Sequence, residues 1–575
     1  MSRFQGGALA AGVVAAIAAF SAGCGGKQTS AEPTAAAAAD GAEAAPAPVT
    51  FVNVTETAGL RFRHENGAFG RKYLPETMGA GCAFLDYDND GRQDIFLVNG
   101  KRFRGKEGSA KPLPALYRNM GNGAFEDVTR AAHLDVVSYG LGLALGDIDN
   151  DGDADLFVNA LGPDHLFRNE GNGTFTDITA QAGVSDPSFG SSATFLDYDK
   201  DGLLDLFVCN YVTWSEADDL FCTIDPPAKS YCTPESYKGA TNHLYRNLGQ
   251  GRFEDVTGKA GVLNPTGKSL GVVVYDHDND GWPDIVVGND TQPNYLYRNR
   301  GDGTFQEIAR EVGIAFSESG VARGSMGIDA ADYDDSGWQS IVIGNFSNEM
   351  IALFHNEGGG LYVDDAPAAG VGPPSLLTLA FGSFFFDYDN DGRIDIFVGN
   401  GHVEPDINKV QKDVHWAEPP HLFQNVGKGR FAVASDKCGH DLQEPLVVRG
   451  AAWGDFDDDG DPDILVSNNG GSPRLLRNDG GNARAWLRVT LQGTKSARDA
   501  YGAELTLTSG GRTQRRTLRG SSSYCSQSEK AVLFGLGRAT GVEKLEIVWP
   551  SGEKQTLSSL PVNTSIHVVE GQPLS

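Results

Sequence analysis

The most constraining feature of this sequence is a nine-residue acidic pattern that recurs from Asp86 to Asp463. Each intact copy has aspartate at positions 1, 3, 5 and 9 and glycine at position 6. The six intact copies supply Asp86, Asp88, Asp90 and Asp94; Asp147, Asp149, Asp151 and Asp155; Asp197, Asp199, Asp201 and Asp205; Asp276, Asp278, Asp280 and Asp284; Asp387, Asp389, Asp391 and Asp395; and Asp455, Asp457, Asp459 and Asp463. A degraded copy, fifth in order, has Asp332, Asp334 and Ser336, with Ser340 at position 9. Such repetition predicts one array of similar units.

The spacing of these aspartates indicates a site for a hard divalent cation. Carboxylates at positions 1, 3 and 5 before a glycine match the first half of an EF-hand calcium loop, in which the glycine permits the sharp turn. Here, however, an apolar strand such as 95–98 follows position 9, and no helix or position-12 glutamate is present. A single copy could equally be an Asp-Gly hairpin turn. Six copies favour calcium, because four clustered carboxylates repel one another unless a cation lies among them. We therefore expect about six or seven calcium ions.

The residues around each loop predict a blade of four antiparallel strands. In the first unit a small-residue strand (79–85) leads into the loop, and strand 95–98 leaves it. A third strand, 116–119, and a Gly-rich turn then precede a fourth strand, 125–129. Seven such units predict an all-β, seven-bladed β-propeller over residues 50–481, with the Gly- and Ala-rich strands innermost.

The two ends of this array indicate how the ring closes. The seventh unit has its third strand at 475–478 but no fourth strand after it. Residues 51–55, Phe-Val-Asn-Val-Thr, resemble the fourth strand 253–257 and can complete that blade. This pairing removes the sheet edges that an open arc would expose.

Alternation of the hairpin connections assigns the loops to two faces of the ring. The acidic loops share one face, and the connections that follow second and fourth strands share the other. Three long insertions, 101–115, 211–241 and 402–421, follow second strands and are therefore expected on the face opposite calcium. The same face is expected to carry the candidate binding residues His64, Glu76, Arg323, His402, Glu404 and Arg449.

The N-terminal residues indicate export. Residues 1–24 resemble a signal peptide, with Arg3 before an apolar run that is too short to remain a membrane span. The run ends in Ser-Ala-Gly-Cys24, which resembles a bacterial lipobox and predicts lipidation of Cys24. Because Ser21 stands where the family usually has Leu, simple secretion is the alternative. Residues 25–49 are Ala- and Pro-rich and are expected to form a tether.

The remaining cysteines and the charge restrict the function further. Cys222 and Cys232 bracket a Pro-rich loop and are the best disulfide candidates in an exported protein. The other four, which are expected to be free buried thiols or a second bridge, are Cys82, Cys209, Cys438 and Cys525. The net charge of -29 arises mostly from the acidic loops and argues against a nucleic-acid partner.

Residues 482–575 predict a separate small β-sandwich or barrel. Six strands are expected, at 486–491, 504–508, 513–518, 531–534, 545–549 and 565–569, with Gly-rich turns between them. The basic run Arg512, Arg515, Arg516 and Arg519 is expected to face solvent or to dock on the acidic propeller.

Taken together, these motifs resemble a known family. The loops are similar to FG-GAP and VCBS repeats, as in integrin α-chain propellers, and the C-terminal motifs 501–504, 520–527, 534–537 and 549–552 resemble the cartilage acidic protein and ASPIC/UnbV family. The resemblance covers residues 51–570 and implies extracellular calcium binding and interaction.

Two functions are consistent with these features. The first is a non-enzymatic, calcium-stabilised interaction propeller outside the cytoplasm that binds a protein or a glycan and meets membranes only through a lipid anchor. The alternative is a propeller hydrolase with its site on the insertion-bearing face. The chain has no Gly-x-Ser-x-Gly, His-Glu-x-x-His or phosphate-loop motif that would favour catalysis.

Overall fold

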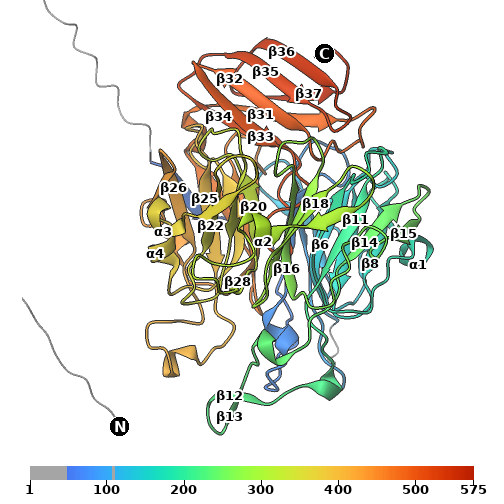
Figure 1. Cartoon of the computed structure of the whole chain (residues 1–575), viewed down its shortest axis with the longest axis vertical. Helices are drawn as coiled ribbons and strands as arrows, with labels where there is room; N and C mark the ends of the chain where they lie inside the picture. Colours follow the sequence, from blue (N-terminus) through green and yellow to red (C-terminus); the bar gives the residue numbers. More distant parts are fainter. Residues whose placement is uncertain (1–47, 107–110, 575) are drawn as a thin grey trace, which may run out of the picture. The chain divides into compact units, whose positions relative to one another are not determined.

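A computed structural model of the chain describes residues 48–106 and 111–574 (Figure 1). The expected signal peptide, Cys24 and nearly all of the tether lie outside these residues. Most of the regular structure is β-strand. The helices within the described residues are single turns, and none of them is long and apolar enough to cross a membrane. The α-helices are α1 (Thr179–Ala182), α2 (Ala309–Val312), α3 (Ala366–Ala369) and α4 (Gly372–Ser375), and the 3-10 helices are η1 (Leu74–Thr77), η2 (Glu216–Asp218), η3 (Pro234–Ser236), η4 (Ile407–Lys409), η5 (Asp441–Gln443) and η6 (Gly481–Ala483).

Seven four-stranded antiparallel sheets contain the acidic loops, and each loop joins the first strand of its sheet to the second. The sheets, in order, are β2 (Cys82–Leu85), β3 (Asp94–Leu97), β4 (Ala115–Asn119) and β5 (Phe125–Asp127); β6 (Gly140–Gly146), β7 (Asp155–Ala160), β8 (His165–Asn169) and β9 (Phe175–Asp177); β10 (Gly190–Leu196), β11 (Asp205–Asn210), β14 (His243–Asn247) and β15 (Phe253–Asp255); β16 (Ser269–Tyr275), β17 (Asp284–Asn289), β18 (Tyr295–Asn299) and β19 (Phe305–Glu307); β20 (Ile328–Ala331), β21 (Ser340–Ile343), β22 (Ala352–Asn356) and β23 (Tyr362–Asp364); β24 (Ala380–Phe386), β25 (Asp395–Asn400), β26 (His421–Gly427) and β27 (Arg430–Val433); and β28 (Val448–Gly454), β29 (Asp463–Asn468), β30 (Arg474–Asp479) and β1 (Thr50–Asn53).

The first strands of these sheets contact one another in a closed cycle. Strand β2 contacts β6, and contacts continue through β10, β16, β20, β24 and β28 back to β2. A cycle of meander sheets around one axis is a β-propeller, so the all-β propeller expected from the repeats is the fold observed. The sheets are therefore called blades one to seven below, in the order given above.

Glycines on or next to the innermost strands allow the blades to approach one another. A Cβ atom on Gly142 of β6 would lie 2.0 Å from the Ser191 carbonyl oxygen of blade three, and one on Gly327 would lie 1.9 Å from the Phe381 carbonyl oxygen of blade six. Any side chain at these positions would push neighbouring blades apart. The small residues near the axis are thus required by the radius of the ring.

The N-terminal strand β1 completes blade seven. It runs antiparallel to β30, with Phe51 opposite Asn478. The Phe51 N–H donates to the Cys438 carbonyl at 2.8 Å, and its ring is 1% exposed, in the core between blades six and seven. The two ends of the propeller sequence therefore share one sheet.

The insertion at 211–241 contains its own hairpin, β12 (Cys222–Asp225) and β13 (Ala228–Ser230), and a disulfide that joins Cys222 to Cys232. This is the pair that the sequence favours. The other four cysteines within the described residues are free and buried. In Figure 1 the hairpin lies at the end of the molecule opposite the C-terminal sheets.

Within the described residues, the C-terminal segment forms two sheets with seven strands, one more than the six expected, because β36 was not predicted. One sheet has the order β34 (Val532–Gly537), β31 (Ala485–Gln492) and β37 (Thr564–Val569). The other has the order β33 (Arg512–Thr517), β32 (Glu504–Ser509), β35 (Val542–Val548) and β36 (Lys554–Leu560). Strand β36 alternates exposed polar residues at the sheet edge, which gives it a weak hydrophobic signal.

Residues 521–529, between β33 and β34, leave the C-terminal sheets and enter the axis of the propeller. We call them the axial segment. The Ser523 N–H donates to the Ile328 carbonyl of blade five at 2.8 Å, and the Gln527 N–H donates to the Cys82 carbonyl of blade one at 3.1 Å. The Cys525 N–H donates to Ser192 Oγ of blade three at 2.9 Å. One short segment thereby binds the inner strands of blades far apart in sequence.

Candidate metal centres

Each of the six intact acidic loops is folded by hydrogen bonds to its own first and last aspartates. In the third loop, Asp197 Oδ1 accepts from the Asp201 N–H and Oδ2 accepts from the Gly202 N–H, both at 3.0 Å. Asp205 Oδ2 accepts from the Tyr198 N–H at 3.2 Å, and its Oδ1 accepts from the Asn247 N–H at 2.8 Å. Gly202 has φ +86, the left-handed conformation that the turn requires.

This folding brings ligand atoms together in at least four of the loops. Asp197, Asp199 and Asp205 each offer an oxygen, and these oxygens lie within 4.8 Å of one another. The same holds for two further aspartate triads and for one group that contains a histidine, namely Asp86, Asp88 and Asp94; Asp147, Asp149 and Asp155; and His277, Asp278 and Asp284. His277, at position 2 of its loop, was not among the ligands predicted from the repeat.

One oxygen in these loops is repeatedly without a partner. The Oδ1 atom of the position-3 aspartate is buried, and no hydrogen-bond partner lies within the described residues, in the first four loops: Asp88, Asp149, Asp199 and Asp278. In three of these loops the Oδ2 atom of the same aspartate is held by an arginine of the third strand. Arg246 Nε lies 2.6 Å from Asp199, and Arg118 and Arg298 repeat this contact at 2.7 and 2.8 Å. The arginine holds one oxygen of the carboxylate and leaves the other without a partner, and such carboxylate oxygens are the ligands that Ca²⁺ takes.

Burial also raises the pKa of the loop carboxyl groups. Loss of hydration raises the pKa of Asp94 to about 8, and repulsion by Asp88 and Asp86 adds to the shift. The pKa of Asp197 is raised to about 7 by the same causes, with Asp201 and Asp199 as the neighbours. The clustered charge is therefore costly near neutral pH unless a cation or protons neutralise it.

The degraded fifth loop has a different charge balance. Asp332 keeps its bonds to the Ser336 and Gly337 N–H groups at 2.9 Å. Asp334, however, lies 2.9 Å from His355 Nε2, and this contact raises the pKa of His355 to about 9. With serine at positions 5 and 9, this loop lacks two of the four patterned carboxylates, and a histidine with a raised pKa lies beside it.

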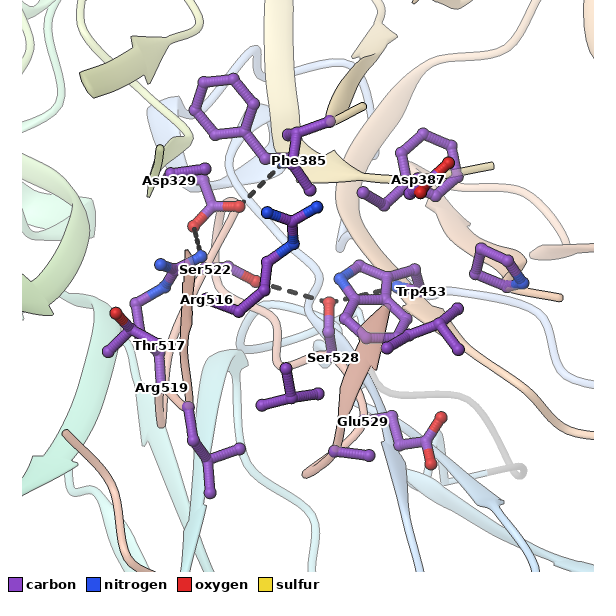
Figure 2. A pocket seen from close by; sticks show the side chains of 18 of the residues that line it. Asp329, Phe385, Asp387, Trp453, Arg516, Thr517, Arg519, Ser522, Ser528 and Glu529 are labelled. Carbon is purple, nitrogen blue, oxygen red and sulfur yellow. Dashed lines mark hydrogen bonds and ion pairs between the residues drawn. The ribbon is translucent and has the colours of Figure 1, made fainter. Parts of the chain in front are cut away.

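The C-terminal sheets dock on the face that carries the acidic loops. Arg512 pairs with Asp335 at 2.8 Å, and Arg519 pairs with Asp329 at 3.0 Å. A cavity of about 90 Å³ lies in this interface, and Trp453 is part of its lining. Figure 2 shows Arg516 and Arg519 near Asp329 in this cavity. Of the two expectations for the basic run, docking on the propeller is thus the one observed.

An asparagine at or near the end of each third strand connects neighbouring blades, a role that was not predicted from the sequence. Asn247 Nδ2 of blade three donates to the Ile148 carbonyl, at position 2 of the blade-two loop, at 2.8 Å. All seven blades repeat this bond to the preceding loop, through Asn119, Asn169, Asn247, Asn299, Asn356, Asn425 and Asn478. The sequence signal that could have indicated this role is the asparagine that follows an arginine, histidine or glutamine in the third strand of every repeat.

We expect Asn247→Ala to lower the free energy of unfolding by about 2 kcal/mol, because it leaves buried carbonyl groups without a donor. Asn247 is 1% exposed and also donates to the Leu204 carbonyl at 2.9 Å. Chemical denaturation measures the change. The exposed Asn408 in η4 provides the control, and Asn408→Ala should change stability by less than about 0.5 kcal/mol. Equal effects of the two substitutions would contradict the role of Asn247.

Five of the six candidate binding residues are joined by contacts on the insertion-bearing face. Arg449 is fully buried and donates to the Gly401 carbonyl at 2.9 Å. Tyr231 connects Glu76 and Glu404, because its hydroxyl donates to Glu76 at 2.7 Å and its N–H donates to Glu404 at 3.1 Å. Arg323 instead forms an ion pair with Asp364 at the end of β23.

The two histidines of this cluster are neutral and engaged with the backbone. His64 Nδ1 accepts from the Gly470 N–H at 3.1 Å, and His402 Nδ1 accepts from the Glu404 N–H at 3.0 Å. Burial, and secondarily the charge of Arg449, lower the pKa of His64 to about 3 and that of His402 to about 4. Both residues are nearly inaccessible, so they support the insertions from within.

Two family comparisons match separate parts of the chain. Residues 493–575 match "ASPIC and UnbV", and residues 86–158, 155–208, 217–287 and 276–343 match the FG-GAP-like repeat. Cartilage acidic protein 1 of Xenopus tropicalis is 28% identical over 320 residues, which are 54% of this chain and 46% of that protein. The Homo sapiens protein is 27% identical over 326 residues, 55% of this chain and 46% of that protein. The chain thus matches less than half the length of these relatives.

Similar solved structures include one titled as an Agrocybe aegerita lectin that recognises non-reducing terminal N-acetylglucosamine. It has a TM-score of 0.37 and 16% identity, and the match covers 70% of this chain and 96% of that one. Another, titled YCF48 bound to D1 peptide, has a TM-score of 0.38 and 10% identity, with 70% and 93% covered.

Proposed function

We propose that this chain, which joins FG-GAP-like repeats to an ASPIC and UnbV segment, is an exported β-propeller. Structural calcium ions in its loops support an interaction surface. The repeats and the C-terminal segment favour an interaction module. The calcium, the export and the partner are parts of the proposal.

The recurring unpartnered oxygen carries the calcium assignment. In four loops the same Oδ1 atom is buried, beside two other carboxylates or a carboxylate and a histidine, with no donor among the described residues. Leaving a buried carboxylate oxygen without a partner is costly, and repeating that cost four times points to a ligand. The oxygen-rich donor set and its turn suit calcium better than a transition metal.

We assign six ions to the six intact loops and none to the fifth. Two of the fifth loop's carboxylates are replaced by serine, and His355 and Arg512 supply positive charge to Asp334 and Asp335. Ions in extracellular modules of this kind bind at roughly 0.1 to 1 mM, which matches an exported protein.

The disulfide between Cys222 and Cys232 supports export, since such bonds persist mainly in oxidising compartments. We further propose that Cys24 carries a lipid that anchors the protein to the cell envelope, with secretion as the alternative.

The insertion-bearing face is the proposed surface for a protein or glycan partner. A binding role is favoured over catalysis because His64 and His402 are buried, neutral and bonded to backbone N–H groups.

Calcium stoichiometry tests the assignment. Equilibrium dialysis against calcium should give about six ions per wild-type chain and about five for Asp199→Asn, which neutralises the position-3 ligand of loop three. Asp436 is exposed and outside the loops, so Asp436→Asn should still bind about six. Failure to bind calcium, or a loss equal in both variants, would overturn the proposal.

A further inference from the structure

A groove of about 890 Å³ opens on the side of the propeller that carries the insertions. One wall is the segment 61–66, which follows β1, and the other is formed by 111–115, at the start of β4. Residues 127–131, from the last residue of β5 onward, and Gly470 of blade seven complete it. The groove therefore lies at the junction where the N-terminal strand closes the ring.

The charge of this groove is opposite to that of the chain. Its lining includes five cationic residues, which are Arg61, Arg63, Arg102, Lys111 and Arg130, and two acidic residues, Glu65 and Asp127. Arg102 pairs with Glu65 at 2.9 Å. Asp127 accepts from the Thr129 N–H at 3.0 Å and from its hydroxyl at 2.6 Å. A local excess of positive charge in a protein of net charge -29 requires an explanation.

Three of these cations have no carboxylate partner. Within residues 48–106 and 111–574, no acidic oxygen lies within 4.0 Å of the charged atoms of Arg61, Arg63 or Lys111, although the chain has 76 acidic residues. All three side chains are exposed. They are therefore free to pair with anions that come from outside the molecule.

The backbone beneath these side chains is fixed. The Arg61 N–H donates to the Tyr117 hydroxyl at 3.0 Å, and the Glu65 N–H donates to Asn99 Oδ1 at 2.7 Å. Asn99 Nδ2 then donates to the Leu113 carbonyl at 2.7 Å, which ties one wall to the other. The cations are thus presented at set positions along a preformed groove, which reduces the entropic cost of binding a partner.

We propose that this groove binds an acidic polysaccharide whose carboxylate or sulfate groups pair with Arg61, Arg63 and Lys111. The assignment deepens the proposed function of the insertion-bearing face and rests on it. Cations spread along a groove suit an anionic group that repeats along a chain better than one compact anion. Pro112, Pro114 and Phe62 supply apolar wall between the charges, against which the carbon face of a sugar ring can lie.

A peptide is disfavoured because several polar backbone groups of the walls already have partners. The Arg61 N–H, the Glu65 N–H and the Leu113 carbonyl are all bonded within the protein. The groove therefore offers little main-chain edge to which an extended peptide could add as a strand.

Binding of the full chain, with calcium present, to immobilised heparin and to polygalacturonate tests this inference. Neutral dextran serves as the uncharged probe, and poly-glutamate represents an acidic peptide. The wild type should bind both acidic polysaccharides and release them as sodium chloride is raised, because salt screens exposed ion pairs. The triple variant Arg61→Glu, Arg63→Glu, Lys111→Glu should bind both polysaccharides with an affinity at least about tenfold lower.

A matched variant separates the groove from net charge alone. Arg252, Lys259 and Lys412 are exposed and lie outside the groove, so Arg252→Glu, Lys259→Glu, Lys412→Glu makes the same charge change. This control should keep the wild-type affinity. Equal losses in the two triple variants, tighter binding to poly-glutamate than to the polysaccharides, or no binding by the wild type would each overturn the inference.

Melting of the same proteins with calcium and with EGTA distinguishes the two proposals. If EGTA lowers the Tm of all of them and no polysaccharide binds, only the groove assignment fails. If calcium has no effect on the Tm, the proposed structural role of the ion fails whatever the groove binds.

Discussion

Removal of calcium with EGTA is expected to lower the Tm of this protein by on the order of ten degrees. At a calcium concentration tenfold above Kd, each filled site stabilises the folded state by about 1.4 kcal/mol. Six sites together contribute about 8 kcal/mol, which is comparable with the whole stability of a typical domain. The loss should fall on the ring as a unit, because each loop is bonded to the Asn of the next blade.

The pH dependence of the calcium-free protein provides a sharper measurement. The folded-state pKa is raised to about 8 for Asp94 and to about 7 for Asp147 and Asp197, well above the value in an unfolded chain. Protonation therefore favours the folded state, and this stabilisation is lost as pH rises through about 7 to 8. In EGTA the Tm should accordingly rise when pH is lowered from 8 to 6.

With saturating calcium the trend should disappear or reverse over the same range, because protons compete with the ion for the same oxygens. Magnesium at equal concentration should restore less of the Tm than calcium, since it demands a tighter octahedral site. An EGTA-treated protein that melts at the calcium-loaded temperature at every pH would contradict a structural role for the ion.

The repeated parts of the fold could be predicted because the sequence states them many times. The spacing Asp86, Asp88, Asp90, Gly91 fixes a turn, and the apolar segments on either side fix two strands. Repetition then removes the ambiguity that a single turn would have. The pairing of 51–55 with the last repeat was also accessible, since blade seven lacks a fourth strand in sequence order.

The features that sequence reasoning missed depend on contacts between distant residues. Gln527 reaches Leu145 of blade two, 382 residues away, and nothing in the local pattern around Ser522 indicates an axial position. The acidic loops were assigned correctly to one side of the ring. The docking of the C-terminal sheets on that side could not be predicted, because it depends on paired charges such as Arg519 and Asp329. Such pairs have no periodic signal.

On the insertion-bearing face, too, the location of the residues could be predicted from the sequence, whereas their burial could not. Alternation of the hairpins was sufficient to predict that His64, His402 and Arg449 share one side of the ring. It could not predict that they are buried, because burial depends on the insertion at 402–421 lying against 64–79, where Lys72 pairs with Glu404 at 2.6 Å. Arg449 fills the space beneath, with contacts to Gly401 and Thr77. Side chains expected to receive a ligand instead hold the loops together.

The axial segment gives the second large expected effect, in the variant Tyr524→Ala. Tyr524 is 1% exposed, its hydroxyl donates to the Met78 carbonyl at 2.8 Å, and its ring centroid lies 5.0 Å from that of Phe381 in blade six. Loss of this ring from the centre of the propeller should cost about 3 to 5 kcal/mol, because the surrounding inner strands cannot collapse to fill the space. The Tm should fall by a margin that calorimetry resolves easily.

Tyr524→Phe is the matched variant, since it keeps the ring and removes only the hydroxyl. It leaves the Met78 carbonyl without that donor and should cost about 1 to 2 kcal/mol.

Hydrogen exchange then tests where the effect acts. The Ile328 N–H donates to the Ser523 carbonyl at 3.0 Å, and the Phe84 N–H donates to the Gln527 carbonyl at 3.3 Å, so both amides report on the seating of the axial segment. In Tyr524→Ala these two amides should exchange faster than the Val54 N–H, which donates to the Leu475 carbonyl at 2.9 Å in the closing blade. Uniform acceleration of all three would mean that the propeller loosens as a whole, and an unchanged Tm would mean that the axial segment does not stabilise the ring.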